Sequence, residues 1–176
     1  MTLDEQRLLR AASFGQSPEL VRLLEQGVNL SVRNGAGDNP LHLAAWSGRT
    51  ECVQILLSFG ADPSVRNSRD ATPLHLAAWQ GHAGCILTLL SRGADLSARD
   101  NCSETPLHFA AWHGHTGCVQ LLLDRGADPE LRNSEGFTAR EVALDRGHAD
   151  CVDLLDAHTG KECLDALWSR RTGAPS

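Results

Sequence analysis

Apolar residues in this chain fall into short clusters that alternate with polar turns. Residues 74–79 read LHLAAW, and residues 85–90 read CILTLL after an intervening Gly-His pair. Clusters of this length, separated by glycine, predict two short helices joined by a turn. Thr72 is a suitable N-cap for the first helix, and Gly81 and Gly93 can end the two helices in the left-handed conformation. The pattern therefore predicts a unit of helix, turn, helix and loop.

The same unit recurs every 33 residues. Its apolar start reads NPLHLAA at 39–45, TPLHLAA at 72–78 and TPLHFAA at 105–111. Degenerate copies, TAREVAL at 138–144 and QRLLRAA at 6–12, lie one further period away on either side. Five units of one fixed period therefore fill nearly the whole chain.

The TPLH motif and the 33-residue period resemble the ankyrin repeat. This resemblance implies an all-α solenoid, an ankyrin-repeat stack of helix-turn-helix units with projecting β-hairpin loops. One unit cannot bury its apolar face alone, whereas stacked units share a continuous core. The expected units are an N-terminal capping repeat at 1–33, inner repeats at 34–66, 67–99 and 100–132, and a C-terminal capping repeat at 133–160.

Positions that are apolar in the inner units become polar in the outer ones, which indicates where the stack ends. Unit one carries Arg10, Glu19 and Arg22 at positions that would face a preceding repeat. Unit five carries Arg140 and Asp156 where a following repeat would pack. We therefore expect a complete array of five units. The inner residues at the position of Arg10 are Leu43, Leu76 and Phe109.

Beyond the fifth unit the period is lost. Apolar residues at helical spacing predict a short C-terminal helix at 161–171, followed by a disordered tail at 172–176. The helix either docks on the last repeat through Leu164 or presents Trp168 and the two arginines after it as a linear motif for a partner.

The loops between units hold two further recurring positions. One needs the left-handed conformation, and Asp70 and Ser103 stand there in place of Gly37 and Gly136. Because serine adopts that conformation at a cost of about 1 kcal/mol, we expect the hairpin at Ser103 to be looser or differently shaped.

The other position is an arginine that follows an aspartate by four residues, which predicts either a ladder of salt bridges or a basic binding stripe. We expect the ladder, because the charge nearby is balanced. The pairs are Asp62 with Arg66, Asp95 with Arg99 and Asp128 with Arg132.

Composition narrows the class of partner. The formal net charge is −6, which opposes the basic footprint of a protein that binds nucleic acid or an anionic membrane. We expect no signal peptide and, because no run of about 18 apolar residues occurs, no membrane span. We expect a monomeric cytoplasmic or nuclear protein whose six cysteines are reduced thiols.

The histidines and most cysteines recur with the repeat, and this assigns them structural roles. The cysteines at positions 52, 85, 118 and 151 read as small buried hydrophobes, and the TPLH histidines resemble the family's structural histidine. His113, His115 and Cys118 suggest zinc, but no fourth ligand is evident. No catalytic constellation rises above the repeat pattern, so we predict a protein that is not an enzyme and that has no cofactor and no metal.

The resemblance implies binding through the ends of the first helices and through the hairpin tips. The two residues after each Ala-Ala pair are Trp46 with Ser47, Trp79 with Gln80 and Trp112 with His113. Three tryptophans in register predict a ladder on the concave face, large enough to mark an interaction site. The alternative is that each ring packs on the neighbouring helix and only holds the stack together.

The hairpin tips shift from neutral or basic to acidic along the array, which predicts that a partner is bound with a defined polarity. The tip candidates are Ala36, Asp38, Arg69, Ala71, Cys102, Glu104, Glu135 and Phe137. We predict a non-catalytic scaffold or adaptor that binds a segment of another protein in the concave groove. The alternatives are a regulatory subunit that occludes a partner's surface and a metal- or redox-responsive protein built on Cys102, Cys163 and His113.

Overall fold

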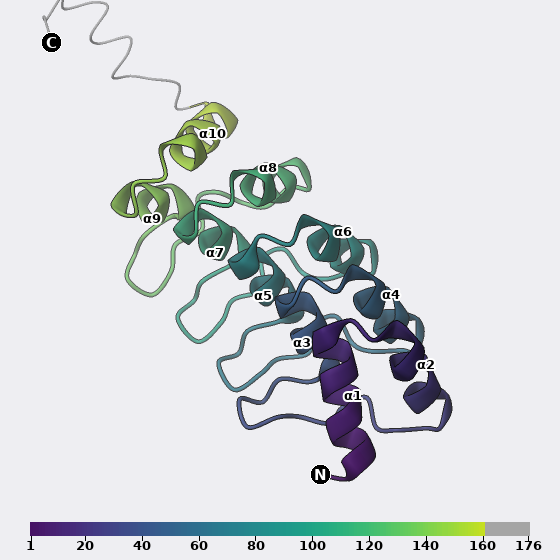
Figure 1. The fold of residues 1–176 in the computed structure, drawn as a ribbon. Coiled ribbons are helices and arrows are strands. Elements are labelled where there is room, and N and C mark those ends of the chain that lie inside the picture. The colour runs from purple at the N-terminus through teal and green to yellow at the C-terminus, as the bar shows by residue number, and fades with distance from the viewer. Residues whose placement is uncertain (161–176) are drawn as a thin grey trace, which may run out of the picture.

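The computed structural model describes residues 1–160, which form ten helices arranged as five stacked pairs (Figure 1). The first helices of the pairs are α1 (Leu3–Phe14), α3 (Pro40–Trp46), α5 (Pro73–Gln80), α7 (Pro106–Trp112) and α9 (Ala139–Asp145). The second helices are α2 (Ser17–Glu25), α4 (Thr50–Ser58), α6 (Ala83–Ser91), α8 (Thr116–Asp124) and α10 (Ala149–Thr159). Each set packs as one row, and long loops project from the row of first helices (Figure 1). The predicted all-helical ankyrin stack is confirmed.

Each first helix begins where its capping residues require it to begin. Thr72 lies in the extended conformation before α5, and its hydroxyl lies 2.8 Å from Nδ1 of His75. Pro73 then occupies the first helical position, where a missing N–H costs nothing. Gly81 ends the helix with φ of 76°, as predicted. Short sequence signals therefore fix the length of α5.

The TPLH histidines join neighbouring units within the core. His75 is fully buried, and its Nε2 donates to the carbonyl oxygen of Glu104 in the next hairpin, 3.1 Å away. Nδ1 therefore accepts from Thr72, which fixes the neutral tautomer. Burial lowers the pKa of His75 to about 4, so the ring is uncharged at neutral pH. The predicted structural role of this column is confirmed.

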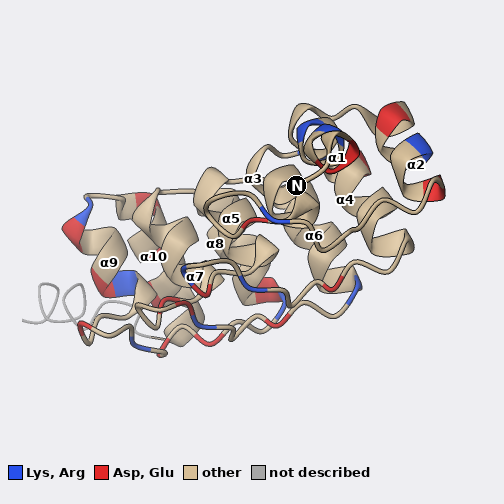
Figure 2. Ribbon diagram, turned by 90° about the horizontal axis from the view of Figure 1, so that it is seen from below, with Lys and Arg blue, Asp and Glu red and all other residues tan. Residues whose placement is uncertain are grey.

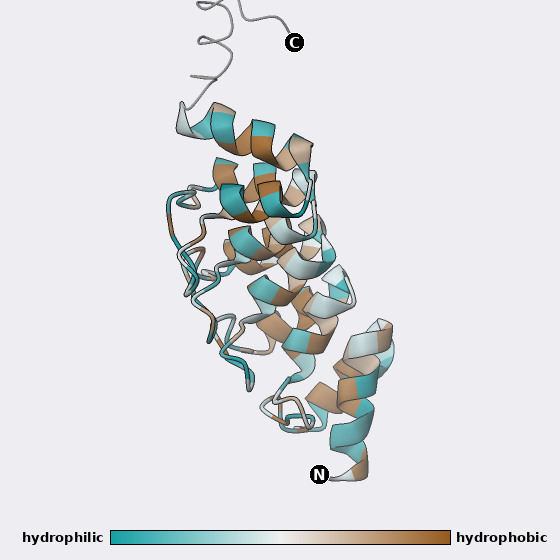
Figure 3. Cartoon of the chain, turned by 90° about the vertical axis from the view of Figure 1, so that its left-hand side faces the viewer, coloured by the Kyte–Doolittle hydropathy of each residue, from teal (hydrophilic) through white to brown (hydrophobic). Residues whose placement is uncertain are grey.

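Small and aliphatic side chains fill the space between the rows of helices. Ala77 and Ala78 are fully buried on α5, where they let the first helices approach closely, and Leu74 and Ile86 are also fully buried. Figure 3 shows the apolar faces turned inward and the projecting loops largely hydrophilic. The core is therefore continuous along the stack.

The last described unit carries an ion pair between its two helices. Arg140 on α9 and Asp156 on α10 face each other through two hydrogen bonds, one of them 2.8 Å long from Nη2 to Oδ2. These residues replace the leucines of the inner units, so each charge satisfies the other where no further unit packs within the described chain. The predicted helix at 161–171 and tail at 172–176 lie outside the described residues.

The hairpin at Ser103 was wrongly expected to be looser or differently shaped. Ser103 has φ of 58° and Asp70 has φ of 57°, so both adopt the left-handed conformation. Ser103 N–H donates to Asp100 at 3.0 Å, as Asp70 N–H donates to Asn67 at 3.1 Å. The hydrogen bonds of the turn thus outweigh the preference of serine. Within residues 1–160 the loops are turns, and their β character is limited to one isolated bridge between Arg132 and Thr138.

The expected ladder of salt bridges between aspartates and arginines was also wrong. Arg66 Nη1 donates to the carbonyl oxygen of Asp70, 2.8 Å away, and to that of Arg99, 2.6 Å away. The carboxylate of Asp62 instead accepts from the N–H of Ser64. Stacking brings the carbonyls of the next hairpin within reach of each guanidinium, so the arginines tie hairpin backbones together.

Candidate binding groove

The described residues form a groove between the hairpins and the ends of the first helices. It consists of two adjoining lobes of about 560 and 410 Å3 that share Trp79, Phe109, Cys102 and Glu104. Backbone hydrogen bonds join successive hairpins, as from Asn101 N–H to the carbonyl of Arg69 at 3.0 Å. The hairpin wall of the groove is therefore continuous over the inner repeats.

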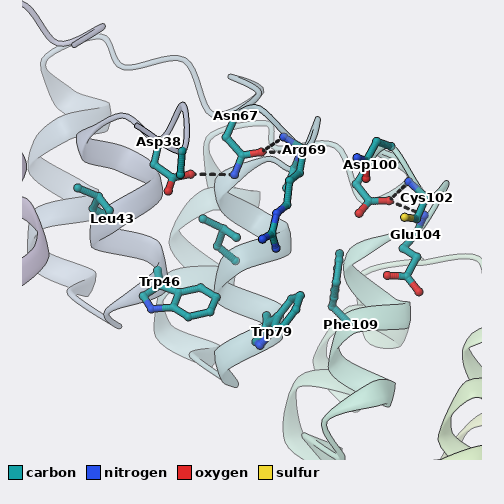
Figure 4. Close-up of a pocket in the computed structure, with 14 residues that line it drawn as sticks. Asp38, Leu43, Trp46, Asn67, Arg69, Trp79, Asp100, Cys102, Glu104 and Phe109 are labelled. Atoms are coloured by element: carbon teal, nitrogen blue, oxygen red, sulfur yellow. Dashed lines mark hydrogen bonds between the residues drawn. The ribbon is translucent and has the colours of Figure 1, made fainter. Parts of the chain in front are cut away.

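Aromatic and aliphatic side chains make the floor of the N-terminal lobe (Figure 4). The rings of Trp46 and Trp79 lie 5.9 Å apart between centroids, and Trp79 lies 5.0 Å from Phe109. Leu43 and Leu76 line the same lobe and are only partly buried. The side chains at this position were expected to face a neighbouring repeat; they also line the groove.

The predicted ladder of three tryptophans is interrupted. Trp79 contacts the ring of Phe109 and that of His113, the latter at 4.9 Å between centroids. Among the ring contacts within residues 1–160, none joins Trp79 to Trp112. Trp112 lines the C-terminal lobe, and the guanidinium of Arg146 lies 3.4 Å from its ring centroid. Trp46 is 38% exposed. The tryptophans therefore both pack against neighbours and present surface to the groove.

An asparagine side chain organises each of three hairpins. Where the preceding hairpin carries a carboxylate, the same side chain also forms a hydrogen bond to it. Oδ1 of Asn67 accepts from the N–H of Arg69 at 2.9 Å and from that of Ala71 at 3.1 Å. Its Nδ2 donates to Oδ1 of Asp38 at 2.8 Å (Figure 4). Asn133 contacts Glu104 in the same way, at 3.4 Å.

Carboxylates line both lobes, and acidic and basic residues both occur along the projecting loops (Figure 2). Glu104 is half-buried, and burial raises its pKa, while the hydrogen bond from Asn133 acts in the opposite direction. Asp100 and Glu135 also raise the pKa of Glu104. The thiol of Cys102 is exposed, yet desolvation and the nearby carboxylates raise its pKa as well. A raised pKa makes Cys102 a weaker nucleophile and metal ligand at neutral pH.

Ten of the fourteen residues predicted from the sequence line the two lobes. The four that do not are Ser47, Gln80, His113 and Phe137. Ala71 lines the groove but is only 4% exposed, so it is part of the wall and not an open tip. The sequence prediction missed lining residues at three repeat positions, namely Leu43 with Leu76 and Phe109, Asn67 with Asp100 and Asn133, and Asn101 with Ser134. The recurrence of Asn34, Asn67 and Asn133 in the column that holds Asp100 is the signal that would have found the second of these positions.

The zinc alternative finds little support in the geometry. Cys118 is buried, and burial raises its pKa to about 11. Nε2 of His115 lies 2.8 Å from the carbonyl of Trp79 and is therefore engaged. Residues 1–160 bring together no group of three potential metal ligands.

No helix in the same range is both long and apolar enough to cross a bilayer.

Comparison with known families agrees with the geometry. The family described as ankyrin repeats (3 copies) matches residues 8–100, and that described as ankyrin repeats (many copies) matches residues 89–143. No curated protein matches the chain. Ankyrin repeats are generally modules of protein–protein interaction and are typically not enzymes. The chain belongs to the ankyrin-repeat family.

Proposed function

We propose that this protein binds an extended segment of a partner protein in the groove between its hairpins and first helices, stoichiometrically and without catalysis. The observation that carries the proposal is the groove itself, whose floor includes Trp46 and Trp79, two rings that the protein covers only in part. Its elongated form suits a polypeptide segment. We also propose a cytoplasmic or nuclear location.

The energetics of such a groove favour a few anchoring side chains. A partly exposed aromatic ring gains free energy when a partner side chain covers it, and tryptophan is enriched among the residues that dominate interfaces. Trp46 and Trp79 already rest on each other, so little side-chain freedom remains to be lost on binding. The hairpin side chains around them provide polar contacts that set register.

A displayed library of random 12-residue peptides, selected on the whole protein, tests this function. We expect Trp46→Ala to weaken the selected peptides by about tenfold or more. Phe59→Ala is the matched control, because Phe59 follows α4 in the other row and is 41% exposed against 38% for Trp46. Peptides that bind both variants as well as they bind the unmodified protein would contradict the proposal.

A further inference from the structure

Asp100 departs from the repeat at the centre of the groove. The same position holds asparagine in the other hairpins, at Asn34, Asn67 and Asn133. Oδ1 of Asp100 accepts from the N–H groups of Cys102 and Glu104, both at 2.9 Å, as the asparagines do in their own turns. Asparagine would therefore serve the turn equally well, and the turn does not explain the carboxylate.

The second oxygen of Asp100 is available to a ligand. Asn67 and Asn133 use the corresponding group to donate to Asp38 and Glu104 in the preceding hairpin. A carboxylate cannot donate, and the preceding hairpin holds Ala71 at the receiving position, which has no side-chain acceptor. The bridge between hairpins is missing at this step, and an acceptor faces the groove instead.

Other carboxylates surround the same place. Glu104 lines both lobes and Glu135 lines the C-terminal lobe, whereas Arg69 is the only cation among the residues that line either lobe in the described chain. Within residues 1–160 neither Asp100 nor Glu104 forms an ion pair. The raised pKa of Glu104 reflects burial together with the resulting mutual repulsion.

Aromatic rings form the remaining walls of the C-terminal lobe. Trp79, Phe109 and Trp112 line it beside Glu104. Ring faces of this kind attract cations, and the protein itself shows the effect at Trp112, where the guanidinium of Arg146 lies 3.4 Å from the ring centroid. The lobe therefore combines apolar walls for an aliphatic stem with unpaired negative charge for its end.

We propose that the groove selects, where its two lobes meet, a lysine or arginine side chain of the bound partner segment, which pairs with Asp100 of the N-terminal lobe and with the shared Glu104 and lies against the shared Trp79. This inference rests on the proposed function. It gives the segment a register, because the N-terminal lobe offers the apolar surface of Leu43, Trp46 and Leu76 to a neighbouring side chain. Charge complementarity with Asp100 and Glu104 argues for this occupant.

The test uses the peptides selected from the 12-residue library. They are expected to share a lysine or arginine at one position. Asp100→Asn keeps the acceptor that the turn needs and replaces the other, charged oxygen with an uncharged NH2 group, so it should weaken these peptides by about tenfold. Glu104→Gln should weaken them similarly, whereas Arg69→Gln should tighten them by lowering the local positive charge.

Asp95→Asn is the matched control for charge. Oδ1 of Asp95 caps a turn through the N–H of Ser97 at 2.8 Å, and the residue lies outside both lobes. The Asp95→Asn variant loses the same negative charge as Asp100→Asn and should bind the selected peptides with an affinity within about twofold of the unmodified protein. Replacing the peptide's basic residue with norleucine should weaken binding to the unmodified protein but have a much smaller effect on Asp100→Asn.

The two proposals fail in different ways. Selected peptides that depend on Trp46 but need no basic residue, or that bind Asp100→Asn unchanged, would overturn the selection of a cation and leave the groove intact. Peptides that bind Trp46→Ala unchanged would overturn the proposed function itself. Peptides with a basic residue whose affinity falls equally with Asp95→Asn would show only long-range attraction and would also overturn the inference.

Discussion

The Nε2 atom of His75 donates to the carbonyl oxygen of Glu104, 3.1 Å away, and so ties a buried helix start to the hairpin that carries a groove carboxylate. His42 and His108 make the same contact with the carbonyls of Ala71 and Phe137. Burial lowers the pKa of all three histidines. The stack is thus held by neutral rings that acid would charge.

Stability should therefore fall in mild acid. The unfolded chain protonates histidine near pH 6.5, whereas burial lowers the pKa of His75 to about 4 in the folded chain. Since the unfolded state binds more protons between these values, the stabilisation is complete above about pH 6.5 and is lost as pH falls toward about 4, with His75 contributing up to about 3 kcal/mol. Urea unfolding from pH 8 to pH 4.5 measures this. A free energy of unfolding that stays constant over that range would contradict it.

Substitution by alanine should change stability in opposite directions at a turn glycine and at a helical glycine. Gly114 has φ of 69°, and a Cβ there would lie 2.5 Å from Nδ1 of His148. Gly114→Ala should destabilise the protein by about 1–3 kcal/mol, because it combines strain with a close contact. Gly117 lies in α8, where an added Cβ would meet nothing within 4 Å, so Gly117→Ala should instead stabilise by up to about 1 kcal/mol. Thermal unfolding of both variants decides; equal effects of one sign would be inconsistent with the geometry.

Thiol reactivity should identify one accessible cysteine in the described chain. In a Cys163→Ser background, Cys102 should react with a disulfide reagent in the folded protein, whereas the buried thiols of the repeat column should react only after unfolding. Because nearby Asp100 and Glu104 raise the pKa of Cys102, Asp100→Asn should speed its reaction at neutral pH. Loss of the fast phase in Cys102→Ser is the control. A fast phase that persists in this variant would show that the column is exposed.

Local sequence signals predicted much of the fold. Thr72 and Gly81 bound a helix through backbone capping, which depends on residues only a few positions apart, and the spacing of Cys85 follows the same helical pattern. The partners of Arg66 could not be predicted in this way. Its acceptor on Arg99 belongs to the next hairpin, and only the stacking geometry shows that a carbonyl lies closer than Asp62.

The groove was predicted only in part, because some of its residues are recognised only from the way the repeats stack. The resemblance to ankyrin repeats pointed to the helix ends and hairpin tips, which include Trp46, Trp79 and Glu104. Phe109 was assigned to contact between repeats, because the sequence of an apolar column is the same whether its side chains face only a neighbouring repeat or also line a groove. The role proposed for Asp100 depends on the absence of a side-chain acceptor at Ala71 in the preceding hairpin. The two positions are seen to face each other only when successive hairpins lie side by side.

The most direct test of the proposed function is a nuclear magnetic resonance titration of the whole protein with a selected peptide, observed through the indole N–H signals and the backbone amides. Binding in the groove should produce its largest shifts at the indoles of Trp46 and Trp79 and at the amides of the hairpins around Asp100. Shifts confined to helices α4, α6 and α8, in the other row, would contradict a binding groove on this face.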